Sequence, residues 1–322
     1  GSHTLAALSE NNIMTTQSNG VIDVADVSKW YGSVVAVNEV SFQVNPGITA
    51  LLGPNGAGKT TMLHLIAGLA KCSDGQITTL GEPVRNNPSL YQRVGFMPEH
   101  ESVYGFYTGR QLVEFSAKLY GLSPLGEAVD RAIQIVGMED AQNRTMDGYS
   151  RGMRQRMRLA AAIVHDPQVM ILDEPLNGTD PRQRIEFQEV MERLASQGRT
   201  ILISSHILEE VETMAGRILL MVSGKLAGSG DFRAIRAKLD EQAYQVRIVV
   251  DEPRRMASAI VALDDVDSVS FDDDGSIVVL SRKVATIQTT LPRMAQENGI
   301  RLTRMEPIDE SLESLFEYIV ER

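Results

Sequence analysis

Short apolar runs alternate with helical patterns along most of the chain. Residues 47–52 (GITALL) and 169–172 (VMIL) are nearly continuous apolar runs, which is typical of strands buried on both faces of a parallel sheet. Residues 94–97 (VGFM) predict another strand. After the first run, Leu63, Ile66 and Ala67 follow helical spacing over residues 60–69. This alternation of strands and helices predicts an α/β fold.

Helical patterns dominate the middle of the chain, between residues 99 and 165. Leu112, Phe115 and Leu119 are spaced as i, i+3 and i+7, as expected for one face of a helix. The apolar spacing continues further along at Ala128, Ile133, Ile135 and Val136. We therefore expect a helical insert in this region.

The last 80 or so residues have a different pattern. Alternation over residues 244–250 predicts a half-buried strand, and a helix is expected at about residues 253–263. Residues 266–271 and 276–280 flank a DDDG turn and predict a hairpin. A helix near residues 284–294, a strand at 300–305 and an amphipathic helix with Leu312, Leu315, Phe316 and Ile319 complete a small ferredoxin-like α/β sandwich. The three aspartates lack the alternating ligands of a calcium loop, so we interpret them as turn residues.

Length and charge limit the possible functions. The 322 residues suggest two domains. The net charge of −11, from 42 acidic and 31 Lys or Arg residues, argues against nonspecific nucleic-acid binding. No apolar run approaches the roughly 20 residues of a membrane span. Cys72 is the only cysteine, which fits a reducing cytosol. Residues 1–20 are expected to be a disordered arm that starts with a tag remnant, Gly1-Ser2-His3.

A phosphate-binding loop is the strongest chemical signal. Residues 53–61 match the pattern G-x-x-x-x-G-K-[ST] and stand between a predicted strand and a predicted helix. In this context backbone N–H groups surround the phosphates of ATP. Lys59 is expected to reach the outer phosphates, and the Thr60 hydroxyl is placed for Mg²⁺. The expected ATP-binding residues here are Gly53, Pro54, Asn55, Gly56, Ala57, Gly58, Lys59, Thr60 and Thr61.

Two adjacent carboxylates end the second apolar run, in the sequence LDEP of residues 172–175. Asp173 is a candidate ligand of Mg²⁺, and Glu174 is a candidate to orient and deprotonate the attacking water. An isolated LDEP sequence would more simply be a core strand ending in solvated acids. Together with a phosphate loop, it indicates a site of nucleotide hydrolysis.

Further motifs identify a family. Residues 149–156 (YSRGMRQR), Asp180 in residues 177–181 (NGTDP) and His206 in residues 204–206 (SSH) accompany the phosphate loop and the LDEP strand. In order and spacing, residues 21–234 resemble the ATPase subunit of ABC transporters. The resemblance implies a P-loop ABC ATPase core at residues 21–235, a helical subdomain at about residues 99–165, and an accessory or regulatory domain at residues 241–322.

The resemblance also implies roles for single residues. Ser150 and Gly152 belong to the signature motif, which contacts the ATP held by the other subunit. Independently, Ser150 has the features of a helix N-cap, where free N–H groups favour a phosphate. By resemblance, Tyr31 lies under adenine, His206 contacts the γ-phosphate and Asp180 communicates across the dimer.

The sequence departs from the family pattern at several positions. Glu99 replaces the usual glutamine beside Mg²⁺, and Thr179 replaces the leucine before Asp180. The signature positions often held by Gly and Gln are Arg151 and Met153, a variation associated with exporters and copper-site maturation systems. The neighbouring arginines, Arg154, Arg156 and Arg158, are expected on a solvated or interface face rather than in a nucleic-acid patch.

These features predict an ATP-hydrolysing homodimer that drives a separate multi-helix membrane permease from the cytoplasmic face of the membrane. Residues 310–316 resemble the closing segment of exporter ATPases, which favours export. The aromatic residues Tyr104, Phe106 and Tyr107 fit either a permease contact or a packed loop. The alternatives are a soluble ABC ATPase acting on ribosomes or DNA, and a simple P-loop kinase or GTPase; the latter leaves Ser150 and His206 unexplained.

Overall fold

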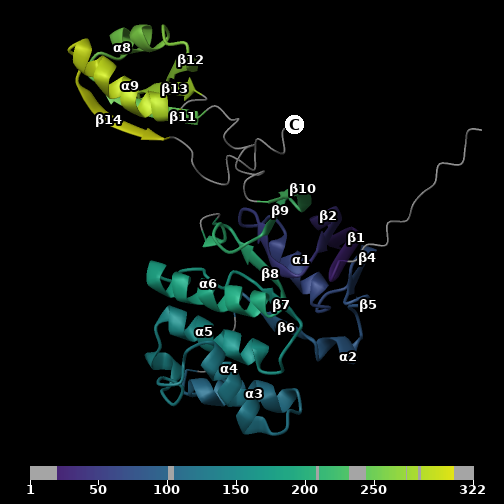
Figure 1. The fold of residues 1–322 in the computed structure, drawn as a ribbon. Coiled ribbons are helices and arrows are strands. Elements are labelled where there is room, and N and C mark those ends of the chain that lie inside the picture. Colours follow the sequence, from purple (N-terminus) through teal and green to yellow (C-terminus); the bar gives the residue numbers. More distant parts are fainter. Residues whose placement is uncertain are drawn as a thin grey trace, which may run out of the picture.

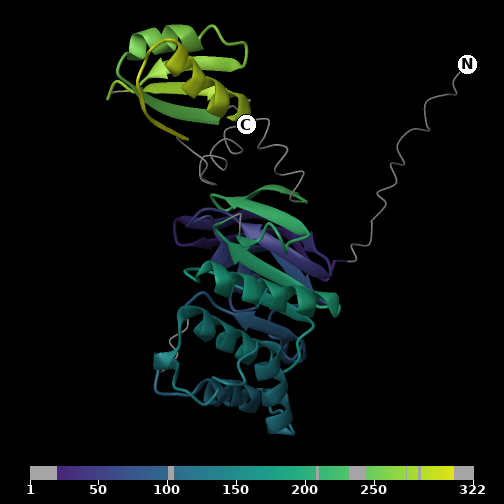
Figure 2. The ribbon, with the colours of Figure 1, turned by 60° about the vertical axis from the view of Figure 1, so that its left-hand side comes forward.

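The computed structural model describes residues 20–100, 105–207, 210–231, 244–272, 274–281 and 284–307. Figures 1 and 2 show their arrangement in two views. Residues 20–231 contain two hydrophobic clusters, and residues 244–307 contain a third cluster of their own. The two parts are described in turn.

A six-stranded sheet forms the centre of the first part (Figure 1). Neighbouring strands pair in parallel, except that β10 pairs with β9 in antiparallel orientation at one edge of the sheet. Within β3, Ala50 and Leu52 face one hydrophobic cluster and Leu51 faces the other, so both faces of the sheet are covered. The α/β fold is therefore confirmed. In spatial order the strands are β10 (Lys225–Gly230), β9 (Arg217–Val222), β3 (Gly47–Leu52), β8 (Thr200–Ser205), β7 (Val169–Leu172) and β6 (Val94–Met97).

An antiparallel sheet packs over one face of this central sheet. It contains β2 (Val34–Val44), β1 (Ile22–Tyr31), β4 (Asp74–Thr79) and β5 (Glu82–Pro83) in that order. Helix α1 (Lys59–Ile66) shares the hydrophobic cluster between the two sheets. A short helix, α2 (Pro88–Tyr91), precedes β6.

Helices cover the other face of the central sheet, and α3, α4 and α5 gather at one end of this part (Figures 1 and 2). Val113 and Ala117 are the buried apolar residues of α3, whereas the side chains of Phe115 and Leu119 are 60% and 72% exposed. The predicted helix is present, but the predicted stripe is not its buried face, because small side chains form the contact with α4 and α5. The helices are α3 (Gly109–Leu119), α4 (Leu125–Ile135), the 3₁₀ helix η1 (Met146–Gly148), α5 (Arg151–Ile163) and α6 (Pro181–Ser196).

Residues 244–307 form a four-stranded antiparallel sheet with two helices. The strand order β12-β13-β11-β14, with the chain order strand, helix, strand, strand, helix, strand, is the expected ferredoxin-like arrangement. Met256 of α8 and Leu291 of α9 pack with Ile248 of β11 in one core. The predicted terminal helix lies outside the described residues. The elements are β11 (Tyr244–Val250), α8 (Pro253–Ile260), β12 (Val266–Phe271), β13 (Ile277–Ser281), α9 (Val284–Glu297) and β14 (Leu302–Pro307).

Asp274 serves the turn between β12 and β13, and Asp273 lies outside the described residues. The Asp274 carboxylate accepts hydrogen bonds from the Ser276 amide at 2.9 Å and from the Ser276 hydroxyl at 2.5 Å. These bonds hold the pKa of Asp274 below its ordinary value. Asp272 pairs with Arg247 of β11 at 2.6 Å. The bonds between Asp274 and Ser276 are those of an Asx turn.

Among the described residues, no helix combines the length and the apolar character needed to cross a bilayer.

Candidate functional site

The phosphate loop connects β3 to α1, as the sequence predicts, and two of its glycines have no room for a side chain. A Cβ on Gly53 would lie 2.2 Å from the Met221 carbonyl oxygen, and one on Gly58 would lie 2.4 Å from the Ala36 carbonyl oxygen. Gly58 also has a φ of 96°, a conformation that favours glycine. Within the part of the chain that the structure describes, no side chain caps the amino end of α1, so its first amides are available to a ligand.

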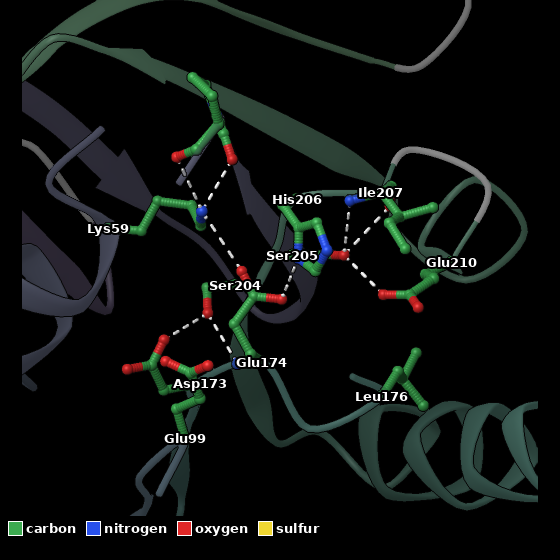
Figure 3. A network of polar contacts seen from close by, with 12 residues as sticks. Lys59, Glu99, Asp173, Glu174, Leu176, Ser204, Ser205, His206, Ile207 and Glu210 are labelled. Carbon is green, nitrogen blue, oxygen red and sulfur yellow. Dashed lines mark hydrogen bonds and ion pairs between the residues drawn. The ribbon is translucent and has the colours of Figure 1, made fainter. Parts of the chain in front are cut away.

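Lys59 lies at the start of α1 with its ammonium group buried. Its Nζ is 2.7 Å from the Gly53 carbonyl oxygen, 3.2 Å from that of Pro54 and 3.3 Å from Glu174 Oε1. The lysine therefore joins the phosphate loop to the end of β7 (Figure 3).

Glu174 occupies a strained backbone position directly after β7, with a φ of 46°. Its amide donates to Ser204 Oγ at 2.8 Å, which helps to hold that conformation. One carboxylate oxygen lies near Lys59, and the other is 2.8 Å from His206 Nδ1. The structure thus brings together three of the predicted residues, Lys59, Glu174 and His206, although they are far apart in sequence (Figure 3).

Asp173 is almost completely buried, and its two carboxylate oxygens differ in their hydrogen bonding. Its Oδ1 accepts a 2.6 Å hydrogen bond from the Ser204 hydroxyl, whereas Oδ2 is buried and has no hydrogen-bond partner among the described residues. Ser204 was not predicted as a site residue, although two serines at the end of a buried strand were a signal that it could belong to the site. It holds Asp173 and the Glu174 backbone from the neighbouring strand, β8.

Glu99 follows β6 and lies near Asp173 (Figure 3). With Glu174 and Arg151 it lines a cavity of about 470 Å³. Its carboxylate lies 3.5 Å from Nδ1 of the exposed His100. Thr60 is exposed in the first turn of α1.

The signature segment starts α5. Ser150 is the N-cap, and its Oγ accepts from the Met153 amide at 3.3 Å. Gly152 is buried in the first turn. Within the described residues, no hydrogen bond joins Ser150 or Gly152 to Lys59 or Glu174. Asp180 caps α6 by accepting from the Gln183 amide at 2.9 Å.

Tyr31 ends β1, and its ring is 52% exposed. Lys29 Nζ lies 4.6 Å from the centre of the ring, a cation–π arrangement that leaves much of the ring accessible.

Of Arg154, Arg156 and Arg158 in α5, one departs from the prediction. Arg158 is buried, and its guanidinium donates to Gln155 Oε1 at 2.7 Å and to the carbonyls of Pro98 and Glu99. It anchors the segment after β6 instead of facing solvent, because those carbonyls need a donor in the interior. Arg156 pairs with Glu186 of α6 at 3.3 Å, and Arg154 is exposed.

A polar cluster that the sequence did not predict lies beside His206. The Ser205 hydroxyl donates to Glu210 Oε2 at 2.7 Å, and Arg184 of α6 lies 3.2 Å from Glu210 Oε1. The Thr179 hydroxyl donates to the Leu176 carbonyl at 2.7 Å and closes the turn before α6. The Arg184–Glu210 ion pair connects α6 to the segment that follows β8, whereas the Thr179 bond lies within the turn between β7 and α6.

Comparison with known proteins agrees with the motifs. The family model for ABC transporter matches residues 37–177. The chain is 33% identical over 306 residues to the bacitracin transport ATP-binding protein BcrA of Enterococcus faecalis, covering 93% of this chain and 96% of the relative. It is 34% identical over 257 residues to the Nod factor export ATP-binding protein I of Sinorhizobium fredii, covering 78% of this chain and 74% of the relative.

A solved structure of the ATP-binding subunit of an ABC transporter has the same fold. The TM-score is 0.61 at 28% sequence identity, over 68% of this chain and 93% of that chain. The motifs, the fold and the relatives agree, and the chain belongs to the family of ABC transporter ATP-binding subunits, which are ATPases.

Proposed function

We propose that this protein is the homodimeric motor subunit of an exporter and drives a separate membrane permease by binding and hydrolysing ATP. The observation that carries the proposal is the position of the Glu174 carboxylate, which contacts Lys59 with one oxygen and His206 with the other. A buried carboxylate between a phosphate-binding lysine and a histidine is arranged for the hydrolysis of a phosphoanhydride.

The phosphates of ATP would occupy the loop at the amino end of α1, with Lys59 reaching the outer phosphates. Lys59 would then exchange its ion pair with Glu174 for the phosphate charge. The freed carboxylate would orient the attacking water and accept its proton, while His206 contacts the γ-phosphate. Tyr31, with its exposed ring, would stack on adenine.

The residues present fit a Mg²⁺ ion bound together with ATP. Asp173 offers a buried Oδ2 without a hydrogen-bond partner, and Thr60 offers an exposed hydroxyl in the first turn of α1. Both are hard oxygen ligands of the kind that Mg²⁺ prefers, and Glu99 provides a third candidate. When bound, the ion would neutralise part of the phosphate charge in the transition state.

A second copy of the chain would complete each ATP site. Ser150 and Gly152 form no hydrogen bond to Lys59 or Glu174 within the described residues of one subunit, and the amino end of α5 favours a phosphate from elsewhere. ATP would clamp two subunits together, because these contacts exist only in the dimer. Asp180 would carry the state of one site to the other.

A membrane permease is the proposed partner. Exposed aromatic and apolar side chains gather on the helical part, at Phe106, Tyr107, Phe115 and Leu119, as expected for a docking surface. Tyr104, the other predicted contact, lies outside the described residues. The names of the relatives, with bacitracin transport and Nod factor export, support an export role at the cytoplasmic face of the membrane.

Coexpression with the permease encoded beside this gene tests the proposal. The two proteins should copurify in detergent, and Phe115→Glu should weaken the complex, since it puts a charge on the apolar surface. Val261→Glu is the matched control, because Val261 is also exposed but belongs to the C-terminal part. Binding to ribosomes or DNA at physiological salt, without permease binding, would instead support the soluble ABC ATPase.

A further inference from the structure

Gln183 of α6 contacts both predicted phosphate-binding groups of the signature segment. Its side-chain Nε2 donates to Ser150 Oγ at 2.9 Å, and its Oε1 accepts from the Gly152 amide at 2.9 Å. One carboxamide therefore bonds the N-cap hydroxyl and a first-turn amide of α5.

This is not the usual use of a glutamine at that helix position. Gln183 is three residues after the N-cap Asp180, and its amide bonds the Asp180 side chain. At the same position of α3, Gln111 turns back and accepts from the Thr108 amide at 2.9 Å, which completes a capping box. Gln183 instead extends to α5, so its side chain serves the contact between two helices.

The surrounding groups are shaped for this contact. A Cβ on Gly152 would lie 2.2 Å from Gln183 Oε1, so a residue with a side chain at position 152 would displace the carboxamide. A second contact lies beside it, because a Cβ on Gly178 would come within 2.2 Å of Arg151 Nη1. The signature segment thus contacts the first turn of α6 at Gln183 and the turn before α6 at Gly178.

The contact leaves the two groups with different capacities to bind a phosphate. Ser150 Oγ accepts two hydrogen bonds, from Met153 and from Gln183, which leaves its O–H to donate outward. The Gly152 amide has a single hydrogen, and Gln183 Oε1 holds it. A phosphate oxygen can accept a hydrogen bond from the Ser150 hydroxyl while Gln183 stays in place. To bind the Gly152 amide, it must displace Gln183 Oε1.

We propose that Gln183 is a positioning residue of the ATP site formed between subunits: it orients the Ser150 hydroxyl and holds the Gly152 amide until the partner's nucleotide displaces its Oε1. This inference rests on the proposed function, in which Ser150 and Gly152 bind ATP in trans. Gln183 thereby raises the ATP concentration at which the dimer closes, while binding of ATP to the single subunit is independent of it.

The test compares Gln183→Met with Gln188→Met, both in a Glu174→Gln background that stops turnover. Methionine matches glutamine in length but forms neither bond. Gln188 is a suitable control, because it lies on the same helix and donates to the Glu210 carbonyl at 2.7 Å instead of to α5. Dimer formation is followed by light scattering during titration with ATP and Mg²⁺, and ATP affinity of the monomer is measured with a fluorescent analogue.

Gln183→Met should lower the ATP concentration for half-maximal dimer by about three- to tenfold, the equivalent of one net hydrogen bond. Gln183→Glu should raise the ATP concentration for half-maximal dimer, because a carboxylate holds the Gly152 amide more tightly and repels phosphate. The affinity of the monomer for ATP should not change. Gln188→Met should form the dimer at the same ATP concentration as its parent. An unchanged or higher concentration for Gln183→Met would overturn the proposal.

A second measurement does not depend on dimer formation. Without nucleotide, hydrogen exchange of the Gly152 amide should be faster in Gln183→Met than in the parent, because its acceptor is gone. Equal exchange rates would overturn the proposal, whatever the dimer does. If the parent itself formed no dimer with ATP, the proposed function would fail, and the exchange experiment would still decide whether Gln183 holds the amide.

Discussion

Lys59 and Glu174 form a buried ion pair, with the ammonium nitrogen 3.3 Å from Oε1 of the carboxylate. The lysine also donates to two carbonyls of the phosphate loop, so its charge is satisfied by groups of the same chain. Arriving phosphates would compete with Glu174 for the same ammonium. The pair thus connects the occupancy of the phosphate loop to the availability of the predicted catalytic carboxylate.

Replacing Glu174 with glutamine should abolish turnover but retain ATP. The amide cannot accept a proton from water, so kcat should fall by at least about 100-fold. Lys59 keeps its carbonyl ligands, so the phosphate loop should remain intact. ATP and Mg²⁺ should then trap the dimer, which light scattering detects.

Glu186→Gln is the control for this variant, since Glu186 is a partly exposed carboxylate of α6 that pairs with Arg156 and Arg182. It should hydrolyse ATP at the parent rate. If Glu174→Gln showed no more dimer with ATP than without it, then either the clamp is absent or the subunits need their permease to close.

The parts of the site that the sequence predicts are those defined by local spacing. The apolar runs 47–52, 94–97 and 169–172 coincide with β3, β6 and β7, because strands buried on both faces need continuous apolar residues. The phosphate loop and the carboxylates stand directly at the ends of two of these strands. Their positions therefore follow once the strands are known.

Other features depend on contacts between distant segments. Ser204 bonds Asp173 from a neighbouring strand, and Gln183 bonds Ser150 from another helix, so no local pattern reveals them. The sequence pattern also does not predict the antiparallel sheet. Register shifts between Val24 and Val27, with a φ of 50° at Asp26, interrupt the alternation that marks a strand.

Glu99→Gln should change the dependence of ATP binding on Mg²⁺. A carboxylate near the phosphates repels them in the absence of a cation and attracts the cation once it is bound. The amide should therefore strengthen metal-free ATP binding and weaken the Mg²⁺ enhancement, by about 1 kcal/mol for a partly solvated site. Titrating ATP with and without Mg²⁺ in both proteins measures the difference.

The exposed neighbour His100 provides the control for Glu99, since it lies 3.5 Å from that carboxylate. His100→Gln should leave the Mg²⁺ enhancement as it is. Equal enhancement in Glu99→Gln and the parent would remove Glu99 from the metal site and leave it, at most, a role in coupling to the permease.

Deleting residues from Glu241 onward should preserve ATP binding. Among the described residues, the core of the C-terminal part, with Ile248, Met256 and Leu291, contains no residue of the ATPase part, so we expect its loss to leave both ATPase clusters covered. We expect the deletion to alter dimer formation or regulation instead. Circular dichroism and ATP titration of the shortened protein check this, and a shortened protein that fails to fold would show that the two parts are one domain.

His165 should make the fold less stable in mild acid. Its ring stacks on Tyr120 with centroids 3.7 Å apart, Nε2 lies 3.1 Å from the Val94 carbonyl, and Nδ1 is buried without a partner. Burial lowers the pKa of His165 from its ordinary 6.5, and the hydrogen bond to the Val94 carbonyl and the nearby Asp166 oppose this only partly. The unfolded chain therefore binds a proton more readily, so stability should fall as the pH drops below 6.5 and level off below the lowered pKa.

Urea unfolding midpoints at several pH values measure this loss of stability. His165→Gln should reduce the pH dependence and His100→Gln should not; an unchanged dependence in His165→Gln would assign the acid sensitivity to other groups.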